Sequence, residues 1–421
     1  MNQTALVLGL GKSGGATAAF LAARGWEVTA ADERGDLPAA AGLAAAGVKP
    51  PPSGPFARVI KSPGLPLSHP WVAPRLARGE AVESDIELAR DFFAGKILAV
   101  TGTMGKSSLA KALADILSRA GQPAVACGNY GVPVATAIAD NPHAAWLVVE
   151  ASSFQLEGAR DFASDIAVLV NLEANHLDRH GSFAAYKAAK MRLFAFQRPG
   201  ATAVVPAGPL AEEVRAAGKA RVVAFSAAGA PAAALEGTYF GRGALLASAA
   251  AVIAAAEAAG IPRATALAGL RSFVPLPHRS GVAVEKDGVR FVDDSKATCL
   301  AATAGSAAMW PAGTVWLLAG GRLKERDFAP SRDALAPRIR KAFLFGEAAP
   351  ALADGWKGAF SLGVFASVAA ATEAAWEEAR AAARETGETQ TVLLAPGATS
   401  FDAYRSCEER GDDFARAARA L

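Results

Sequence analysis

Short apolar runs that predict β-strands alternate along this chain with segments of helical spacing. The first series opens with a strand at Ala5–Leu8, then a glycine turn, a helix over about 15–24 and a second strand at Glu27–Ala31. Such alternation is typical of α/β domains, in which helices connect the strands of a parallel sheet. The pattern therefore predicts an α/β fold.

Two more series of the same kind follow. The second has strands predicted at 96–101, 146–149, 166–170 and 203–205, a region of loops at 227–243 and a helix at 244–259. The third follows a boundary marked by Pro275, Pro277 and His278, and has strands predicted at 289–292, 314–319, 341–345 and 391–394. We therefore expect three domains, with the boundaries 1–92, 93–275 and 276–421.

Composition narrows the class of protein. Of the 421 residues, 52% are hydrophobic and 20% are charged, so the chain can bury large cores and is not a disordered protein. The net charge is only +3 and no basic stripe is visible, which argues against a nucleic-acid or membrane-surface partner. Three cysteines without metal-site spacing fit a reducing compartment, and no apolar run approaches the roughly 20 residues of a membrane helix. With no signal peptide visible, we expect a cytoplasmic protein. Nothing in the sequence demands an oligomer, so we also expect a monomer.

The first motif is a glycine turn, GLGKSG at 9–14, between a predicted strand and a helix. Glycines let the backbone approach a phosphate at a helix N-terminus, and Asp32 at the end of the next strand could accept a hydrogen bond from a ribose or a base. A dinucleotide such as NAD is the first interpretation. Another nucleotide, or a turn that serves packing alone, are the alternatives.

The second motif is more specific. The strand KILAV leads into TGTMGKSS at 101–108 and then into a helix, the arrangement of a P-loop. Backbone N–H groups of such a turn surround phosphates, while Lys106 would reach the β/γ oxygens and Ser107 would bind Mg²⁺. The strict pattern requires a glycine where this chain has Val100, so a solvated lysine in a glycine turn is the alternative.

Polar side chains follow two predicted strands of the same series. Glu150 comes directly after WLVV, and His176 follows IAVLV. Other polar residues near these positions are Ser152, Ser153, Gln155, Asn171, Glu173, Asn175, Asp178, Lys187, Lys190 and Arg192. Ligands of open α/β sheets gather at the carboxyl ends of strands, so Glu150 and His176 are expected beside the P-loop, where they could hold Mg²⁺. A plain surface position is the alternative for His176.

These motifs and their order resemble those of the Mur ligases, and in particular those of the branch that adds glutamate. The resemblance covers essentially the whole chain. Its motifs are GLGKSG, KSPGLP, SDIELA, TGTMGKSS, GNYG (128–131), VEASSFQLE (149–157), NHLDRH (175–180), YKAAKMRLF (186–194), PHR (277–279), DDSKAT (293–298) and APGATSFD (395–402).

The resemblance implies three α/β domains: a Rossmann-like N-terminal one for a UDP-sugar, a P-loop ATPase-like central one and a Rossmann-like C-terminal one for the incoming amino acid. The first glycine turn would then hold UDP instead of NAD. The implied reaction is an ATP-dependent addition of glutamate, in the main interpretation D-glutamate, to UDP-N-acetylmuramoyl-L-alanine in peptidoglycan precursor synthesis. ATP would phosphorylate the alanine carboxylate, and the glutamate amino group would attack the resulting acyl phosphate. Two Mg²⁺ ions would neutralise charge on the transferred phosphoryl group.

The resemblance also implies roles for individual residues. The implied catalytic residues are Lys106, Asn129, Glu150, His176 and Lys190. ATP would be bound by Gly102, Thr103, Gly105, Lys106, Ser107, Ser108, Arg279 and Asp294, and the UDP-sugar by Lys12, Ser13, Asp32, Glu33, Arg34, Ser62 and Gly64. The implied metal ligands are Ser107, Glu150, His176 and Lys190. Lys190 would act as a carbamate, because reaction with CO₂ turns a cation into an anion that can bind Mg²⁺; the alternative is a lysine on a helix surface.

Glutamate would be received by Lys296, Thr298, Lys324, Ser400 and Phe401. The two lysines supply cations for its two carboxylates. We also expect Ser400 to lie where the strand TVLLA turns into the helix FDAYRSCEER, whose N-terminal N–H groups would favour an anion.

Some positions depart from the family pattern. The segment in which the family has HNxxN for adenine is ALLAS at 244–248, without asparagine, and Cys299 replaces a usual asparagine in the glutamate pocket. Four alternatives therefore stay open beside the main interpretation. They are an L-glutamate-adding ligase, a nucleotide-binding homologue without catalysis, a folylpolyglutamate synthetase and an NAD-dependent oxidoreductase.

Overall fold

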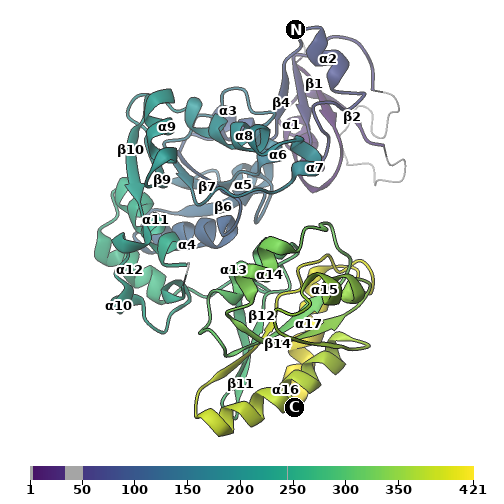
Figure 1. The fold of residues 1–421 in the computed structure, drawn as a ribbon. Coiled ribbons are helices and arrows are strands. Elements are labelled where there is room, and N and C mark those ends of the chain that lie inside the picture. Colours follow the sequence, from purple (N-terminus) through teal and green to yellow (C-terminus); the bar gives the residue numbers. More distant parts are fainter. Residues whose placement is uncertain (1–2, 34–50, 244) are drawn as a thin grey trace. The chain divides into compact units, whose positions relative to one another are not determined.

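The protein was analysed as a computed structural model, which describes residues 3–33, 51–243 and 245–421. Arg34, predicted to bind the UDP-sugar, lies outside the described residues, as does Ala244 of the segment compared with HNxxN. The described chain forms an α/β fold with three sheets, as the alternation predicts (Figure 1).

The first sheet has four parallel strands in the order β2-β1-β3-β4. The strands are β1 (Thr4–Leu8), β2 (Glu27–Ala31), β3 (Arg58–Lys61) and β4 (Val82–Ser84), and the helices are α1 (Lys12–Ala22), α2 (Ala73–Ala77) and α3 (Glu87–Phe92). Helix α1 begins at Lys12, earlier than the predicted 15, because the Gly15 N–H already donates to the Gly11 carbonyl at 2.8 Å. The last three residues of the glycine motif thus lie in the first helical turn.

The second sheet has six parallel strands in the order β10-β9-β8-β5-β7-β6. They are β5 (Lys96–Thr101), β6 (Ala124–Gly128), β7 (Trp146–Glu150), β8 (Ile166–Leu169), β9 (Thr202–Pro206) and β10 (Arg221–Phe225). The α-helices of this region are α4 (Lys106–Arg119), α5 (Val134–Asp140), α6 (Ser153–Leu156), α7 (Leu177–His180), α8 (Phe183–Ala195), α9 (Pro209–Ala217), α11 (Leu245–Ala258) and α12 (Arg263–Arg271). In strand β5 every residue after Lys96 is buried, and four of them form the apolar run ILAV, as expected of a parallel strand covered on both faces.

Some sequence-based boundaries in this region were wrong. Strand β7 includes Glu150, which pairs in register with Val100 and Gly128 instead of following the strand. Strand β8 ends at Leu169, one residue before the prediction. The region 227–243, predicted as loops, contains helix α10 (Ala232–Leu235) and two short 3₁₀ turns at Ala227–Gly229 and Tyr239–Gly241. The glycines of this stretch had suggested loops, but its alanines favour helix.

The third sheet has six strands in the order β11-β12-β16-β13-β14-β15. They are β11 (Gly281–Lys286), β12 (Val289–Asp293), β13 (Val315–Gly320), β14 (Ile339–Phe345), β15 (Ser361–Val364) and β16 (Gln390–Leu394). Strand β11 pairs antiparallel with β12, a departure from the parallel sheet that we expected. The two form a hairpin through Asp287 and Gly288, both at positive φ.

Helices cover both faces of the third sheet. Helices α13 (Leu300–Ala307), α14 (Ala329–Leu335) and α15 (Ala349–Gly355) share one core, and α16 (Val368–Thr386) and α17 (Cys407–Ala420) share the other (Figure 1). Helix α16 shows which features of the sequence produce such a covering helix. Its buried residues recur every three or four positions from Val368 to Ala383, the Ser367 hydroxyl caps its start, and Gly387 ends it in a left-handed conformation.

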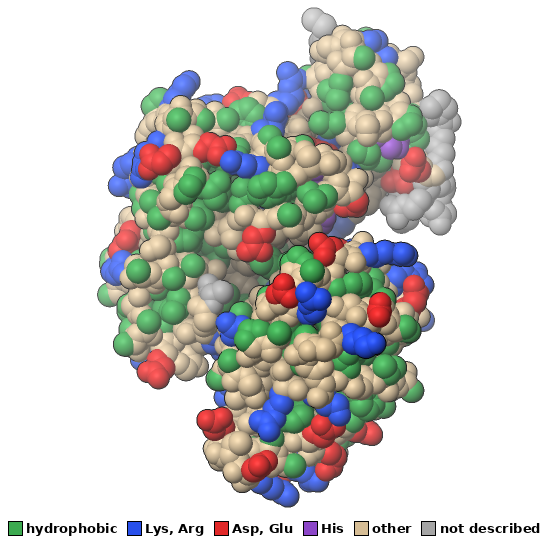
Figure 2. Space-filling view, in the orientation of Figure 1, with side chains coloured by type: hydrophobic (Ala, Val, Ile, Leu, Met, Phe, Trp, Pro, Cys, Tyr) green, Lys and Arg blue, Asp and Glu red, His purple; other side chains and the backbone are tan. Residues whose placement is uncertain are grey.

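The chain divides into two compact units. The first comprises 1–231 and 247–272 and holds the first two sheets, whose residues share one hydrophobic core. The second comprises 232–246 and 273–421 and holds the third sheet. On the face shown in Figure 2, acidic and basic side chains of the described residues are interspersed. Among the described helices, none combines the length and the apolar character that crossing a bilayer requires.

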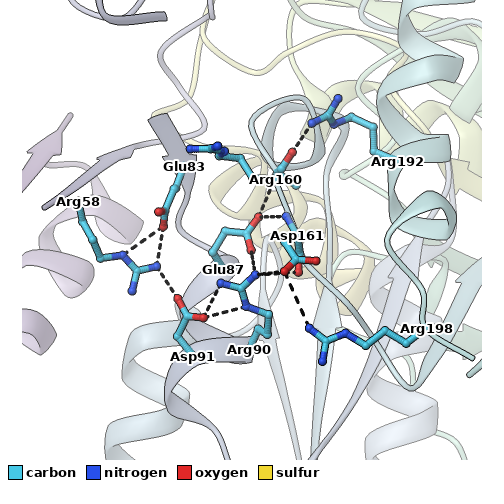
Figure 3. A network of polar contacts seen from close by, with 10 residues as sticks. Arg58, Glu83, Glu87, Arg90, Asp91, Arg160, Asp161, Arg192 and Arg198 are labelled. Atoms are coloured by element: carbon cyan, nitrogen blue, oxygen red, sulfur yellow. Dashed lines mark hydrogen bonds and ion pairs between the residues drawn. The ribbon is translucent and has the colours of Figure 1, made fainter. Parts of the chain in front are cut away.

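An ion-pair network joins the first two sheets (Figure 3). On α3, Arg90 pairs with Asp161 at 2.5 Å, and the Glu87 carboxylate accepts the backbone N–H groups of Arg160 and Asp161. Arg58 on β3 extends the network to Glu83 and Asp91, at 2.5 and 2.6 Å. We name this cluster the Arg90 junction.

Candidate active site

The P-loop turn lies between β5 and α4, as predicted. Gly102 and Gly105 have φ values of 155° and 77°, which L-residues rarely adopt, and Ser107 and Ser108 are buried in the first turn of α4. The N–H groups of Thr103 and Met104 donate to the Asn171 side-chain oxygen at 3.0 and 2.9 Å. Asn171, at the end of the neighbouring strand β8, thus holds the turn in shape, a role that its position in the sequence did not reveal.

Two lysines donate to the carbonyl groups of this turn. The Nζ of Lys106 donates to the Thr103 carbonyl at 2.8 Å. The Nζ of Lys190, on α8, donates to the Gly102 carbonyl at 2.7 Å and to the Thr101 hydroxyl at 3.4 Å. Lys190 is only 1% exposed, so the helix-surface alternative is wrong. Burial, and to a smaller extent Lys106, lower the pKa of Lys190 to about 6 against the attraction of Glu150.

Glu150 ends strand β7 beside the P-loop strand and is 1% exposed. One carboxylate oxygen accepts the side-chain N–H of Asn129 at 2.7 Å. The other oxygen, Oε2, is buried and has no hydrogen-bond partner among the residues that the structure describes. Burying a carboxylate oxygen without a hydrogen-bond partner lowers stability unless a cation or a hydrogen-bond donor contacts it. The surroundings of this oxygen therefore fit a bound Mg²⁺ ion.

His176 directly precedes the short helix α7 in a left-handed conformation, with φ of 53°, and is exposed. This conformation costs a non-glycine residue roughly 1–2 kcal/mol, and it commonly marks a functional position. The His176 ring lies 4.9 Å from the Phe154 ring and 6.5 Å from the Tyr186 ring. Because the Tyr186 hydroxyl is 3.0 Å from that of Thr103, this set of contacts places His176 on the P-loop side of the sheet, although it stays a surface residue.

In the first glycine turn, Gly14 meets the Gly9 carbonyl so closely that a Cβ atom would lie 1.8 Å from its oxygen. Asp32 is nearly buried, and its carboxylate accepts the Leu10 N–H at 2.5 Å. Thus Asp32 shapes the turn itself, in addition to any ligand contact. Ser62 borders the same turn, since a Cβ on Gly9 would lie 2.8 Å from the Ser62 Cβ.

The other residues predicted for the UDP-sugar lie near this turn or on the loop after β3. Lys12 Nζ donates to the Gly131 carbonyl at 2.9 Å, and the Ser13 hydroxyl donates to Asp85. Glu33 contacts His69 at 3.1 Å, and Gly64 is exposed. Their roles toward a ligand stay predictions.

The motif VEASSFQLE is largely structural beyond Glu150. Ser152 and Gln155 form a capping box for α6, and the Gln155 amide also donates to both oxygens of Asp85 at 3.3 Å. The Ser153 hydroxyl lies 3.0 Å from His180 Nε2. The three polar residues that follow Glu150 therefore cap helix α6 and bind Asp85 and His180.

In the second unit, Asp294 follows β12 and hydrogen-bonds to Ser280 and Ser306, and burial raises its pKa to about 6. Neighbouring His278 has φ of 59° and pairs through Nδ1 with Asp293 at 2.7 Å. A Cβ on Gly411 would lie 2.1 Å from this His278 nitrogen, so helix α17 needs glycine there. Arg279 is half-buried in the same turn.

The residues predicted to receive glutamate share no single environment. Lys296 pairs with Glu408 of α17 at 2.6 Å, and the Thr298 N–H donates to the Lys296 carbonyl at 2.9 Å. Lys324 is exposed, Ser400 is buried, and Phe401 is 63% exposed.

The prediction that Ser400 stands at a helix N-terminus was wrong. Helix α17 begins at Cys407, with the Ser406 hydroxyl accepting the Glu409 N–H as its cap. Acidic Glu408 and Glu409 follow this cap in the first turn, where negative charge favours a helix start. The N-terminal N–H groups of this helix therefore do not lie at Ser400, where we expected them to favour an anion.

Arg410 is a residue that the sequence did not single out. It is fully buried and donates five hydrogen bonds, to Ser295, Gly320 and Ala398. Gly320 is the last residue of β13, and Ser295 and Ala398 lie shortly after β12 and β16, so Arg410 joins three strand ends near the predicted glutamate residues. The available signal was its position, four residues before Phe414 on the buried face of α17.

Comparisons with known proteins identify relatives of this chain. Residues 100–247 match the Mur ligase middle domain, a span that includes the P-loop, Glu150, His176 and Lys190. A UDP-N-acetylmuramoylalanine--D-glutamate ligase of Solibacter usitatus is 35% identical over 99% of this chain and 98% of its own length. The same-named ligase of Anaeromyxobacter dehalogenans is 36% identical over 98% and 96%.

A solved structure shows the same fold at lower identity. MurF ligase from Thermotoga maritima in complex with ADP aligns with a TM-score of 0.59 and 18% identity over 87% of this chain and 90% of that one. The relatives that match over their full length show that the chain belongs to the Mur ligase family.

Proposed function

We propose that this protein catalyses the ATP-dependent addition of D-glutamate to UDP-N-acetylmuramoyl-L-alanine, a step of peptidoglycan precursor synthesis. The relatives that match the whole chain carry that name, and the chain spans at least 94% of their length in the most similar cases. The observation that carries the proposal is the arrangement at the P-loop, where Lys106, Lys190 and Glu150 converge on adjoining strand ends.

The proposed reaction begins with phosphoryl transfer from ATP to the alanyl carboxylate. One carboxylate oxygen bonds to the γ-phosphorus and ADP leaves, giving an acyl phosphate. The glutamate amino group then attacks the acyl carbon, loses a proton, and phosphate leaves with that oxygen. Such a transfer needs positioning and positive charge more than covalent help from the protein. Lys106 and the first turn of α4 supply this at the β/γ oxygens, and Gly102, Thr103, Gly105, Ser107 and Ser108 shape the cradle.

The residues at this edge fit Mg²⁺. Ser107 and the unpartnered Oε2 of Glu150 would hold one ion, and His176 with a carbamate on Lys190 would complete a second site. Bound Mg²⁺ would neutralise charge on the phosphoryl oxygens. The chain offers no cluster of three His, Cys, Asp or Glu side chains for a metal within its described residues, which agrees with a site completed by hydroxyl, carbamate and phosphate oxygens.

Carbamate formation on Lys190 suits its surroundings. Only an unprotonated amine attacks CO₂, and the buried Lys190 has a pKa of about 6 and is therefore mostly neutral at pH 7. Formation of the N–CO₂⁻ group releases one proton from the amine. It would place an anion next to Lys106 and a bound metal.

The remaining parts of the proposal follow the family pattern. The three sheets would be domains with boundaries near 92 and 275, for the UDP-sugar, ATP and glutamate respectively. Arg279 and Asp294 would contact ATP, and Lys296, Thr298, Lys324, Ser400 and Phe401 would receive glutamate. A cytoplasmic monomer is part of the proposal, and its three cysteines are free, which suits a reducing compartment.

Phosphate release from ATP in the presence of UDP-N-acetylmuramoyl-L-alanine tests the function. We expect turnover that requires this substrate together with D-glutamate and that L-glutamate does not support. Turnover with L-glutamate alone would favour the L-glutamate-adding alternative. Failure of both enantiomers would contradict the ligase assignment and favour a homologue that binds nucleotide without catalysis.

A further inference from the structure

A second junction between the first two sheets lies at the loop 62–65, which carries the UDP-sugar candidates Ser62 and Gly64. This loop follows strand β3 and faces helix α7, whose N-terminal residue is preceded by His176. The contact between them is made by Arg179, a residue of the NHLDRH motif to which no role has been given above.

Arg179 binds the backbone of this loop with its guanidinium group. Its Nη1 donates to the Gly64 carbonyl at 3.2 Å, and its Nη2 donates to the carbonyls of Pro63 and Leu65 at 3.3 and 3.0 Å. Three successive carbonyl groups thus converge on one side chain. A planar, always charged guanidinium with several donors can satisfy such a set, whereas a lysine ammonium is a single point.

Glu157, at the end of α6, ties this contact to strand β3. It pairs with Arg179 and, at 3.3 Å, with Lys61, the last residue of β3. Lys61 is almost fully buried and also donates to the Leu65 carbonyl at 3.1 Å and to the Phe154 carbonyl at 3.3 Å. The strand, the loop and the two short helices therefore share one partly buried polar cluster, and the buried Lys61 makes the loss of a partner costly to stability.

The cluster also reaches the catalytic side of the second sheet. The Arg179 guanidinium carbon lies 4.8 Å from the centre of the Phe154 ring, and that ring contacts His176 at 4.9 Å and His180 at 5.6 Å. Helix α7 is only four residues long and is bounded by left-handed His176 and Gly181, so the direction of Arg179 is set by a tightly turned backbone. One side chain thus contacts both the loop and the group of rings around His176.

We propose that Arg179 is a positioning residue that holds the loop 62–65 in the conformation that binds the UDP-sugar and fixes this loop relative to the His176 helix. The inference rests on the proposed function, because it assigns the ligand of that loop. Arg179 does not itself touch the reacting atoms. Its removal is expected to weaken binding of the UDP-sugar substrate while leaving ATP binding intact, since Asn171, Lys106 and the P-loop turn do not depend on Arg179.

The test uses Arg179→Ala and Arg179→Lys in the full chain. A matched control is Arg90→Ala, which breaks the Arg90–Asp161 pair at the Arg90 junction (Figure 3), another ion pair between the same two sheets. Hydrogen–deuterium exchange of the 59–66 segment is measured without ligand. Binding of UDP-N-acetylmuramoyl-L-alanine and of ATP is measured separately by calorimetry, and the KM values for both substrates are compared with kcat.

We expect exchange in 59–66 to rise at least tenfold in both Arg179 variants and to stay within twofold in the Arg90 variant. The affinity for UDP-N-acetylmuramoyl-L-alanine should fall at least tenfold in both Arg179 variants, with the affinity for ATP within twofold of the wild type. If Arg179→Ala fails to fold, Arg179→Lys decides the matter, because it keeps the charge opposite Glu157 but not the fork of donors.

Three results would overturn the inference: unchanged exchange in 59–66, an unchanged affinity for the UDP-sugar despite faster exchange, or equal losses for both ligands. A wild-type protein that binds no UDP-sugar at all would instead contradict the proposed function. The exchange measurement, which needs no ligand, separates these two failures.

Discussion

Lys106 and Lys190 are the same type of residue, and they donate to carbonyl groups one position apart in the P-loop turn. Lys106 lies in the first turn of α4, half-buried, with its ammonium at the Thr103 carbonyl. Lys190 comes from α8, more than 80 positions later, and reaches Gly102 from inside the protein at 1% exposure. Burial and the nearby charge of Lys106 lower the pKa of Lys190 to about 6.

The difference teaches that one turn can use two lysines for opposite purposes. A half-buried ammonium remains a cation that can meet phosphate oxygens. A buried amine near another cation is held neutral, so it can react with CO₂ and become an anion beside a metal. The predictions below either break this distinction or make it sharper.

The largest effect is expected from removing either lysine. Lys106→Ala and Lys190→Ala should each lower kcat by at least about 10³-fold, because the first removes a cation from the phosphate oxygens and the second removes the proposed carbamate ligand of a metal ion that neutralises them. Acetate or formate should restore part of the activity only to Lys190→Ala, since these anions replace a carbamate and not an ammonium. Steady-state phosphate release measures both.

Two neighbouring lysines serve as controls. Lys187, on the same helix as Lys190, pairs with Glu213, and Lys111, on the same helix as Lys106, pairs with Asp115 at 2.5 Å. Alanine at either position should leave kcat within about twofold, as expected for exposed ion pairs. Rescue of Lys106→Ala by carboxylates, or unchanged activity of Lys190→Ala, would erase the distinction between the two lysines.

Glu150→Gln should have the next largest effect. Glutamine can still accept the Asn129 N–H, but it presents a neutral group where the buried Oε2 now lies. We expect kcat to fall by about 10²-fold and the Mg²⁺ concentration for half-maximal activity to rise, because one metal ligand loses its charge. A Mg²⁺ titration of activity measures this, and an unchanged Mg²⁺ requirement would remove Glu150 from the metal site.

Removal of CO₂ should lower activity only through Lys190, the lysine that is held neutral. Wild-type protein held in CO₂-free buffer at pH 7 to 8 should lose several-fold activity and regain it on addition of bicarbonate. Native mass spectrometry should show a mass increase of one CO₂ in the wild type and none in Lys190→Ala. The same increase in both proteins would assign the carbamate to another amine.

The pH dependence of stability gives a smaller and independent measure. The pKa of Lys190 is about 6 in the folded protein against an ordinary 10.5, so between these values the unfolded chain binds a proton that the folded chain does not. The unfolding free energy of the wild type should therefore rise with pH from 6 to 9 relative to Lys190→Met, by at most about 1.4 kcal/mol per pH unit. Denaturant unfolding in CO₂-free buffer measures this, and identical slopes in the two proteins would contradict a neutral Lys190.

The smallest effect on kcat is expected from Asn171, the residue that shapes the turn for both lysines. Asn171→Ala removes the acceptor of the Thr103 and Met104 N–H groups, at a cost of about 1–3 kcal/mol for buried donors left unpaired. We expect the KM for ATP to rise roughly tenfold, with kcat reduced less. A larger fall in kcat than rise in KM would mean that Asn171 contacts the reacting groups.

The sequence predicted those parts of the site that depend on local pattern. The strand KILAV, the glycine turn and the helix after it occur in one continuous segment, and WLVVE places an acid directly at the end of an apolar run. The alternation of strands and helices likewise predicted the three sheets. Short or half-buried strands such as β4 and β15 escaped notice because three or four residues carry too little periodicity.

The parts that sequence did not reveal depend on contacts between distant residues. Arg410 bonds to residues as far as 115 positions away, Arg179 bonds to a loop 114 to 116 positions earlier, and Asn171 holds a turn 67 and 68 positions before it. Each of these is an ordinary polar residue within its own segment. Only the sheet order, which brings β8 beside β5 and β16 between β12 and β13, turns them into parts of a site.

The central claim is that this protein activates the alanyl carboxylate by transferring phosphate to it. The most direct test supplies UDP-N-acetylmuramoyl-L-alanine labelled with ¹⁸O in both carboxylate oxygens, together with ATP, Mg²⁺ and D-glutamate. An acyl phosphate predicts that each released phosphate carries one ¹⁸O atom and that the new amide keeps the other. Amide formed with unlabelled phosphate, or no phosphate release at all, would contradict the account.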